Sequence, residues 1–262
     1  GPTAFHLRHS IQYGNVIMQK KSVTAILFLV LLLSACNGMG VPFNAVKGSG
    51  SVASEDRAVQ GIRAVALAAP GDLEITLGDQ ETLRIEAEEN LLPYIETIVE
   101  DGVLTIREKN DSTLLPTRPI RCYLTVTGLD SLAVSSSGNI TAPTLAADHF
   151  SVSINSSGNI TLAGIEGQTL EVQINSSGNL EIGGGKVDQQ DISINSSGSY
   201  RAEDLESWEA TVHLNSSGSA TLWVRKRIDA SLSSSGNLYY YGDPLVMAET
   251  TSSGTAISQG EK

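Results

Sequence analysis

Residues 151–161 read SVSINSSGNIT, and the same segment recurs as EVQINSSGNLE (171–181), DISINSSGSYR (191–201) and TVHLNSSGSAT (211–221). The Ser-Ser-Gly triplet at its centre occurs seven times, first at intervals of 20 residues and finally at intervals of 18. A repeat this short and this regular predicts a stack of similar coils, each contacting only its neighbours. The glycines that end the triplets are Gly138, Gly158, Gly178, Gly198, Gly218, Gly236 and Gly254.

Apolar and polar residues alternate on both sides of the triplet, as at Val152 and Ile154 before it and at Ile160 and Leu162 after it. Period-two alternation with β-branched residues indicates half-buried strands, so each repeat holds two short strands and a corner. The repeat is too short for a propeller blade, which needs roughly 40 residues. The sequence therefore predicts an all-β chain: a single-stranded parallel β-helix with coils of ~20 residues, whose stacked strands lie about 4.8 Å apart.

Each triplet is interpreted as a corner between two strands. A sharp bend often requires a positive φ, which only glycine adopts cheaply, so we expect positive φ at the triplet glycines. Stacked corners also bring polar side chains into register, and stacked asparagines share amide hydrogen bonds. The corner is thus predicted to be structural, the alternative being a repetitive polar surface that contacts a ligand. The expected ladder consists of Asn155, Asn175, Asn195 and Asn215, with a parallel column of Ser156, Ser176, Ser196 and Ser216.

The segment from Met18 to Cys36 has the three parts of an export signal. Two lysines precede an apolar stretch (23–33) that is too short to span a bilayer as a helix. The stretch ends in Leu-Ser-Ala-Cys36, which resembles the lipobox of bacterial lipoproteins and implies acylation of Cys36. The alternative is a plain secretory signal with a chance cysteine. By the same resemblance, Asn37 after the cysteine favours the outer membrane over the inner membrane.

These features divide the chain into four parts. Residues 1–17 precede Met18 and are interpreted as a non-native upstream stretch, followed by a lipoprotein signal peptide at 18–35. Residues 36–47 are expected to form a lipid-anchored tether, and 48–258 the globular domain. Acylation with several chains holds a protein at a membrane firmly, whereas one chain alone does so only marginally.

Charge narrows the range of partners. The chain has 17 basic and 29 acidic residues, and residues 1–35 hold three of the basic ones and none of the acidic ones, so the remainder carries a net charge of −15. This charge argues against nucleic acid as a partner and against peripheral binding to anionic lipids. If Cys36 is acylated, Cys122 has no partner for a disulfide, so stability must come from the stacked core.

Residues 48–130 lack the triplet but keep the alternation typical of strands. Glu100-Asp101-Gly102 has the residues of a hairpin turn, and a short helical turn is expected between Glu88 and Thr97. Because no linker separates this part from the repeats, we predict one continuous domain in which less regular early coils cap the stack.

Four segments of this early part resemble the head GIN domain of auto-transporter adhesins: GIRAV (61–65), GDLEIT (71–76), NLLPYI (90–95) and DGVLTI (101–106). The recurring Ser-Ser-Gly-Asn coils are the other hallmark, and the resemblance covers roughly residues 48–258. It implies a secreted or lipid-anchored bacterial protein with a right-handed parallel β-helix and supplies no catalytic residues. One departure is AAPG (68–71), where the family tends to have a Ser-Gly-rich stretch.

The search for catalytic chemistry finds one arrangement of interest. The histidines after the signal, His149 and His213, occupy unlike positions in different repeats, and motifs for zinc or for a serine nucleophile are absent. Acidic residues gather in two successive coils, where they resemble the calcium-binding clusters of polysaccharide-cleaving β-helices, with Lys186 or Arg201 as base. The alternative is a solvated acidic edge. These acids are Asp188, Asp191, Glu203, Asp204, Glu206 and Glu209.

Aromatic residues gather in the last coils: Trp208, Trp223, Tyr239, Tyr240 and Tyr241. Capping of the open end of the stack is the favoured interpretation, and binding of a glycan or a protein partner is the alternative.

The sequence therefore predicts a non-enzymatic, lipid-anchored protein of the bacterial cell envelope, an interaction or adhesion-like module without cofactor or metal. The expected partners are the membrane, through the anchor, and a glycan or an envelope protein. A polysaccharide-processing enzyme and a structural envelope protein without a dedicated ligand remain alternatives.

Overall fold

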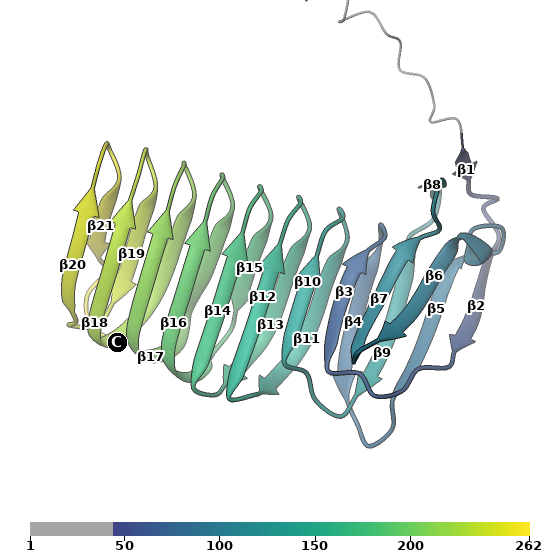
Figure 1. The fold of residues 1–262 in the computed structure, drawn as a ribbon, viewed down its shortest axis with the longest axis horizontal. Helices are drawn as coiled ribbons and strands as arrows, with labels where there is room; N and C mark the ends of the chain where they lie inside the picture. Colours follow the sequence, from purple (N-terminus) through teal and green to yellow (C-terminus); the bar gives the residue numbers. More distant parts are fainter. Residues whose placement is uncertain (1–43) are drawn as a thin grey trace, which may run out of the picture. The chain divides into compact units, whose positions relative to one another are not determined.

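The alternating apolar and polar residues of the repeats form strands, in which every second side chain is buried. In β12 (His149–Ile154), Phe150, Val152 and Ile154 are at most 1% exposed, whereas His149 is exposed. The computed structural model describes residues 44–262, which form a β-solenoid of about 6 turns (Figure 1). Within this range no helix is long and apolar enough to cross a membrane. The predicted stack of parallel coils is confirmed.

Each coil has two long sides that meet at the Ser-Ser-Gly corner. The first side precedes the corner and consists of β3 (Ala64–Ala68), β7 (Val103–Glu108), β10 (Ser131–Val134), β12, β14 (Thr169–Ile174), the last residues of β16 (Gly185–Ile194), β17 (Ser199–Leu214) and β18 (Ser219–Leu232), and β20 (Leu245–Thr250). The second side follows the corner and consists of β4 (Asp72–Leu77), β9 (Arg121–Val126), β11 (Asn139–Ala146), β13 (Asn159–Glu166), β15 (Asn179–Ile182), the first residues of β17 and β18, β19 (Asn237–Tyr241) and β21 (Thr255–Ser258).

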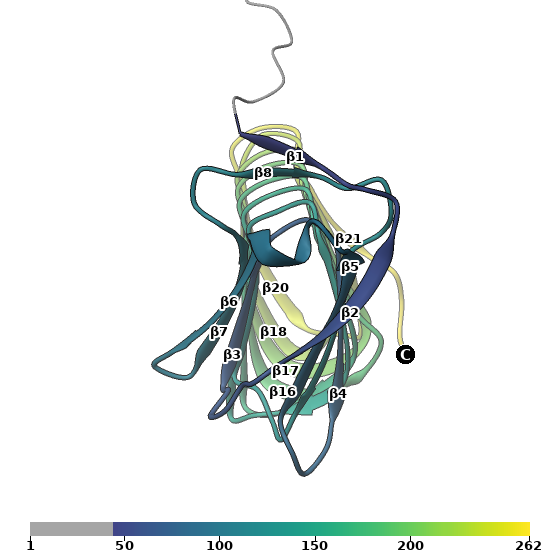
Figure 2. The ribbon, with the colours of Figure 1, turned by 90° about the vertical axis from the view of Figure 1, so that its right-hand side faces the viewer.

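A short third side returns the chain from the second side to the first. Its strand pairing joins 144–146 to 164–166, then to 185–186, and then to 205–206. Figure 2 looks along the stack and shows the coils superposed. The outward column of this third side consists of Ala146, Glu166, Lys186, Glu206, Trp223 and Tyr241.

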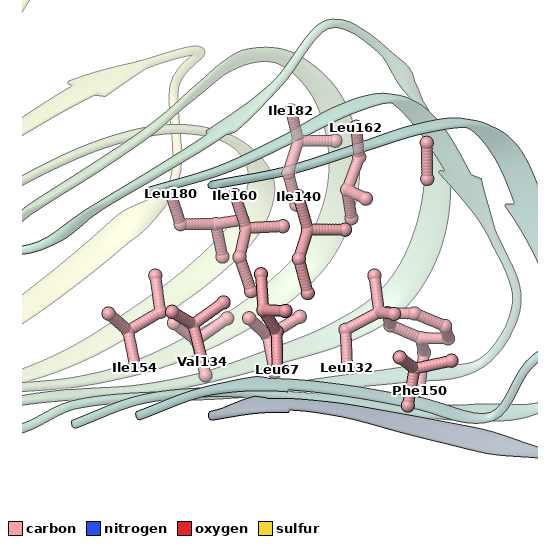
Figure 3. Close-up of a cluster of buried hydrophobic side chains, with 14 of the residues drawn as sticks. Leu67, Leu132, Val134, Ile140, Phe150, Ile154, Ile160, Leu162, Leu180 and Ile182 are labelled. Atoms are coloured by element: carbon pink, nitrogen blue, oxygen red, sulfur yellow. The ribbon is translucent and has the colours of Figure 1, made fainter. Parts of the chain in front are cut away.

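The register of the coils turns the repeat into columns of like side chains. Ile154 pairs with Val134 on one neighbouring coil and with Ile174 on the other, so one inward column is apolar throughout. Side chains from the two long sides point toward one another and fill the interior (Figure 3). Each fully buried aliphatic side chain contributes about 1.5–3 kcal/mol to the free energy of unfolding.

The triplet glycines are needed for a reason that differs from the predicted one. Positive φ occurs at seven other glycines of residues 44–262 and at none of the seven triplet glycines. Instead, the carbonyl oxygen of Gly178 accepts a hydrogen bond from the amide of Ser199 at 3.3 Å, which places this oxygen against the Cα of Gly198. A Cβ at Gly178 would lie 2.3 Å from the carbonyl oxygen of Gly158, and one at Gly198 would lie 2.6 Å from that of Gly178. The prediction of positive φ was wrong, because close approach of successive corners explains the glycines.

The earliest coils are stacked in an order that differs from their order in the sequence. β3 pairs with β10 along one edge and with β7 along the other edge, and β4 lies in the same way between β11 and β9. The coil formed by β3 and β4 is therefore enclosed by residues that follow it in the chain. Gly71, with φ of 126°, occupies the corner of this coil, and its carbonyl oxygen lies 2.5 Å from the Cβ position of Gly138. The segment AAPG (68–71), which departs from the Ser-Gly-rich stretch of the family, thus still has a glycine at the corner.

Antiparallel strands cover the N-terminal end of the stack. β6 (Ile95–Glu100) forms a hairpin with β7, and β5 (Thr82–Glu88) lies between β9 and β2 (Val52–Arg57). The predicted hairpin turn is confirmed by positive φ at Asp101 and Gly102, and the predicted helical turn by a 3-10 turn at Leu92–Tyr94. The prediction of early coils alone was incomplete, because antiparallel strands supply the cap.

The structured unit begins at Asn44, before the predicted boundary at residue 48. β1 (Ala45–Lys47) pairs with β8 (Thr113–Leu115), and the side chain of Asn90 accepts from the amide of Ser49 and donates to the carbonyl of Lys47, both at 2.8 Å. These bonds hold residues 47 and 49 on the cap. At the other end, the amide of Gln259 donates to Tyr240, so ordered structure extends past the predicted limit at residue 258.

One buried carboxylate joins the incoming chain to the cap. Glu88 is fully buried and accepts hydrogen bonds from the amide of Gly50 at 2.6 Å, from the amide and hydroxyl of Thr117 at 2.8 and 2.5 Å, and from the amide of Arg118 at 3.2 Å. Burial by itself raises the pKa of this carboxyl, but the hydrogen bonds, that of the Thr117 hydroxyl foremost, outweigh it and lower the pKa to about 2. The ionised form is therefore the one that stabilises the cap.

The corner geometry predicts that Gly178→Ala and Gly178→Asn destabilise the protein equally, by about 2 kcal/mol or more, because any Cβ meets the preceding backbone. The control Ser177→Ala, at an exposed corner residue, should change the free energy of unfolding by less than about 0.5 kcal/mol. Urea midpoints measure both effects. A stable Gly178→Asn variant would restore the positive-φ explanation, since asparagine tolerates that conformation.

A second prediction concerns Glu88 and pH. Because the folded pKa of about 2 lies below the ordinary value of 4.5, ionised Glu88 contributes its full stability above pH 4.5 and loses it as the pH falls towards 2. Glu88→Gln should lower the urea midpoint at pH 7, and its difference from the wild type should shrink steadily below pH 4.5. The exposed control Glu181→Gln should leave the midpoint unchanged at pH 7. A gap for Glu88→Gln that is constant from pH 7 to about pH 2 would contradict the assignment.

Candidate functional site

Asparagine side chains form a hydrogen-bonded ladder along one edge of the corner, as predicted. The amide of Asn175 donates to Oδ1 of Asn155 at 2.8 Å, Asn195 donates to Asn175 at 2.7 Å, and Asn215 donates to Asn195 at 2.6 Å. Each inner amide thus uses one donor and one acceptor within the ladder. The four side chains are exposed, so the ladder also forms part of the outer surface.

A second ladder, which the sequence reading missed, follows the corner. Asn139 donates to Asp72 at 2.8 Å, Asn159 donates to Asn139 at 2.9 Å, and Asn179 donates to Asn159 at 2.8 Å. The hydroxyl of Ser199 continues the ladder by donating to Asn179 at 2.6 Å. Its signal in the sequence was the asparagine directly after Gly138, Gly158 and Gly178.

The corner serines bond to the backbone of the preceding coil. The hydroxyl of Ser136 donates to the carbonyl oxygen of Ala69 at 2.8 Å, and that of Ser156 donates to the carbonyl oxygen of Ser136. Of the predicted serine column, Ser156 makes such a contact between its side chain and the backbone of the neighbouring corner. Together with the two ladders, these contacts support a structural role for the corner.

Several of the acidic residues considered for catalysis are paired with cations. Glu206 lies 3.1 Å from Arg225 and 3.7 Å from Lys186, and Glu209 lies 2.8 Å from Lys226. Asp204 pairs with Lys262, and Asp191 accepts a hydrogen bond from Gln189. Across residues 44–262 no three acidic, histidine or cysteine side chains are arranged to hold a metal ion.

Three of the clustered aromatic residues, Trp208, Trp223 and Tyr241, lie on the outer face of the third side, where the repeat shortens from 20 to 18 residues. In the pairing of β17 with β18, Ser207 lies opposite Val224 and Glu209 opposite Arg227. Trp208 therefore faces two residues, Arg225 and Lys226, which is the geometry of a β-bulge. Its side chain is 47% exposed.

One cation lies over the Trp208 ring and two lie over the Trp223 ring. The Nζ of Lys186 lies 5.8 Å from the centroid of the Trp208 ring, and the guanidinium of Arg225 lies 4.9 Å from that of Trp223. The Nζ of Lys262 lies 5.7 Å from the Trp223 ring and 5.2 Å from the Tyr241 ring. These distances are within the range of cation–π attraction.

A buried chain of hydrogen bonds supports this surface from behind. The hydroxyl of Tyr200 donates to Gln190 at 2.7 Å, Gln190 donates to Ser207 at 2.9 Å, and Ser207 donates to the carbonyl of Trp223 at 3.0 Å. Burial raises the pKa of the Tyr200 hydroxyl, so it stays protonated as a donor. The sequence signal was Gln190, a polar residue in the inward column of Leu170 and Ala210.

The predicted capping role applies to only part of the aromatic cluster. Trp208 lies between the coil of Lys186 and that of Arg225, and Trp223 pairs with Tyr241 of the next coil, so neither tryptophan ends the stack. Tyr240 does pack against the hydrophobic core near the last coil. The two tryptophans therefore belong to the lateral surface.

A model of the family described as "Putative auto-transporter adhesin, head GIN domain" matches residues 63–244, which is more than half of the chain. The chain belongs to this family. The family resemblance that was predicted from the four early segments and the Ser-Ser-Gly-Asn coils is thereby confirmed. No curated protein matches the chain.

Solved structures share the fold of this head GIN domain. A "putative adhesin" from Bacteroides fragilis aligns with a TM-score of 0.72 at 17% identity and covers 83% of this chain and 100% of its own. A "Putative lipid binding protein" from Parabacteroides distasonis aligns at 0.66 with 23% identity, covering 82% and 99%. A "putative adhesin" from Parabacteroides merdae aligns at 0.65 with 20% identity, also covering 82% and 99%.

A hollow of the head GIN domain lies on the second side near the cap. It has a volume of about 440 Å³ and is lined by outward residues of β4, β9 and β11, with Asp72, Glu74, Arg121 and Tyr123 among them. Tyr123 also borders a neighbouring hollow of about 640 Å³ between β2, β5 and β9. Both are shallow and carry charges of both signs, so neither selects a ligand by charge.

The remaining reactive side chains lie apart from one another. His149 and His213 are exposed on different coils, as expected from their outward positions. Cys122 is buried, and burial raises the pKa of its thiol to about 12, which keeps it protonated and unreactive at neutral pH. Cys36, the predicted lipidation site, lies outside the described residues.

Proposed function

We propose that this chain is a non-enzymatic, lipid-anchored protein of the bacterial cell envelope that presents a rigid solenoid for adhesion-type binding. The observation that carries the proposal is membership of the head GIN domain family over residues 63–244. The adhesin description of that family indicates association with the cell envelope or surface. The ligand class is a glycan or an envelope protein.

The architecture suits presentation of a binding surface. The core is continuous from the cap to the last coils, so the solenoid behaves as one rigid unit along its stack. A rigid surface loses little conformational entropy on binding. Because side chains fill the interior, a ligand has to bind on the outside. This applies equally to a lipid, the ligand class that the description of one structural relative mentions.

The position of residue 44 leaves only a short segment between the cap and the proposed lipid anchor at Cys36. Residue 44 is already held by the amide of Thr113, and Cys36 lies eight residues earlier in the sequence. Eight residues span at most about 28 Å when fully extended. An acylated Cys36 would therefore keep the cap near the membrane. Asn37, which follows Cys36, favours the outer membrane as the place of the anchor.

The polysaccharide-cleaving alternative is less well supported. Such an enzyme needs carboxylates that converge around calcium, with a basic residue poised beside them. Here Glu206 and Glu209 are instead paired with Arg225 and Lys226, and Lys186 contacts the indole ring of Trp208. Two of the acids and Lys186, one of the two candidate bases of the competing model, are therefore engaged by other side chains.

Lipidation is tested with the full chain expressed in bacteria. We expect an alkynyl fatty acid to label the wild type and to leave Cys36→Ala unlabelled, because Leu-Ser-Ala-Cys36 provides the acylated thiol. The variant should also move from the membrane fraction to the soluble fraction. Cys122→Ala is the matched control and should be labelled like the wild type. Persistent labelling of Cys36→Ala would show that the anchor is elsewhere.

The enzyme alternative is tested with residues 44–262. A ligand that binds the folded state raises the melting temperature by mass action. Because we expect no calcium site, calcium at about 5 mM should leave the melting temperature unchanged. Incubation with polygalacturonate should release no unsaturated ends absorbing in the ultraviolet. If calcium stabilises the protein and cleavage occurs, and both are lost in the Asp188→Ala/Asp191→Ala variant, the enzyme replaces the binding module.

A further inference from the structure

We propose that the outer face of the N-terminal cap rests on the phospholipid surface into which the lipid anchor inserts, with Val52, Tyr94 and Leu115 as its apolar contacts. This contact deepens the proposed function and rests on it, because it requires the anchor at Cys36. It makes the membrane a partner of the cap and sets the direction in which the solenoid projects.

The two-stranded sheet of β1 and β8 turns one face away from the core. Neighbouring side chains of a strand point to opposite faces. Because Leu114 is buried, Leu115 lies on the outer face, where Lys47 is its partner in the register. Leu115 is 40% exposed, and Lys47 is exposed as well. Figure 2 shows this sheet together with the 3-10 turn at the N-terminal end of the stack.

Tyr94 lies beside the residues through which the chain enters the cap. It ends the 3-10 turn, is 36% exposed, and accepts a hydrogen bond at its carbonyl oxygen from the amide of Lys109 at 2.8 Å. Tyr94 and residues 44–46 line a common hollow of about 400 Å³. A tyrosine, with an apolar ring and a polar hydroxyl, suits the boundary between lipid and water.

Val52 is tied to the strand of Leu115 through a buried carboxylate. Glu88 accepts hydrogen bonds from the amides of Gly50 and Thr117, at 2.6 and 2.8 Å. Gly50 precedes Val52 by two residues, and Thr117 follows Leu115 by two residues. Two residues span at most about 7 Å, so both apolar side chains belong to the same end of the unit. Val52 is 56% exposed.

Charge is nearly balanced in the three segments that carry these contacts, 44–52, 88–94 and 108–118. They hold three basic residues, all exposed, and four acidic residues, of which two are exposed and two accept hydrogen bonds from backbone amides. These residues are Lys47, Lys109 and Arg118, and Glu89, Asp111, Glu88 and Glu108. A balanced surface gives anionic lipids no advantage over neutral ones. The contact is therefore apolar, which agrees with the acidic composition of the chain.

The anchor selects the lipid surface as the occupant. The last coil also has exposed apolar side chains, with Leu245 at 63%, so exposure alone does not distinguish the two ends. Only the cap is joined to Cys36 by the eight residues that precede Asn44, which span at most about 28 Å. A tether this short holds the cap at an effective concentration of about millimolar at the bilayer. A contact too weak to bind a free protein is populated under that condition.

A cap that rests on the membrane directs the coils away from it. The coils follow one another from the cap to β20 and β21 (Figure 1). From β7 to β20 the first side has eight strand spacings of about 4.8 Å, or about 38 Å. The outer faces of the three sides then stay clear of lipid and open to a ligand.

Fluorescence quenching by lipid tests the contact in the full chain, lipidated in bacteria and reconstituted in phosphatidylcholine vesicles. A nitrobenzoxadiazole label is placed on Leu115→Cys in the cap or on Leu245→Cys in the last coil, the matched exposed control. The thiol of Cys122 is buried and that of Cys36 carries the acyl chain in the lipidated protein, so the new cysteine takes the label. Nitroxide-bearing lipids should lower the Leu115→Cys signal at least about twofold, since interfacial segments bury their apolar face about 5–10 Å into the boundary of headgroups and acyl chains. The Leu245→Cys signal should stay unchanged.

Variants on the Leu115→Cys background then identify the side chains that make the contact. Val52→Ser combined with Tyr94→Ser should weaken the quenching, because the other two apolar contacts are lost. The matched control is Leu77→Ser, at an exposed residue that ends β4 on the side away from the corner, and it should leave the quenching unchanged. Thermal melting followed by circular dichroism checks that each variant is folded. Addition of phosphatidylglycerol to the vesicles should not strengthen the quenching, because the charges of this end are balanced.

Equal quenching of both labels would overturn the proposal, because the solenoid would then lie flat on the membrane. Quenching that requires phosphatidylglycerol, or that persists in the double variant, would also contradict the apolar contact. A Leu115→Cys label that is shielded from aqueous iodide but not quenched by lipid would assign the cap to a protein partner.

Flotation of the vesicles separates this inference from the proposed function. If the protein floats with the vesicles and the Leu115→Cys label is not quenched, the membrane contact of the cap is wrong and the lipid anchor remains. If the protein does not float, the anchor itself is wrong, and the contact that requires it is wrong as well.

Discussion

The close approach of successive corners is the contact on which the rest of the structure depends. The carbonyl oxygen of one corner glycine accepts a hydrogen bond from the residue that follows the next corner glycine, and the two backbones meet without room for a Cβ. This contact fixes the register of both long sides at once, because each begins or ends at the corner. The inward columns of apolar residues and the outward ladders of asparagine then follow from the register alone. A shift of one residue would move every buried side chain to the surface.

The same constraint explains where the solenoid is free to vary. The two long sides are tied to the corner, so a change in coil length has to be absorbed on the third side. The shortening from 20 to 18 residues is absorbed there by register shifts in the pairing of β17 with β18, beside Trp208, which is 47% exposed. The buried contacts of Tyr200, Gln190 and Ser207 replace an apolar column at this level and support the irregular backbone. The irregular side thus carries the surface with the most distinctive chemistry, while the repeated corner remains structural.

The sequence predicted those features that depend on period and alternation. Parallel coils, the inward position of residues such as Ile154, the Asn155–Asn175 hydrogen bond and the hairpin at Asp101-Gly102 all follow from local pattern. It did not predict features that depend on contacts between distant residues. The position of β3 between β7 and β10 results from long-range pairing, which no local pattern encodes. The explanation predicted for Gly178, a positive φ, was wrong for the same reason. A side chain at this position is excluded by the backbone of Gly158 on the neighbouring coil and not by the φ of Gly178 itself. Trp208 was noticed for its residue type, but only the structure shows that it is 47% exposed and lies beside Lys186 of the neighbouring coil.

Native-state hydrogen exchange at the corners tests the central claim most directly. The amides of Asn155, Asn175 and Asn195 donate to the carbonyl oxygens of Val134, Ile154 and Ile174 on the preceding coils, each at 2.9 Å. If the corners fix the register, these amides should exchange as slowly as those in the middle of the long sides, through opening of the whole stack. Exchange of the corner amides at the rate of exposed loops, while the long sides stay protected, would contradict the account.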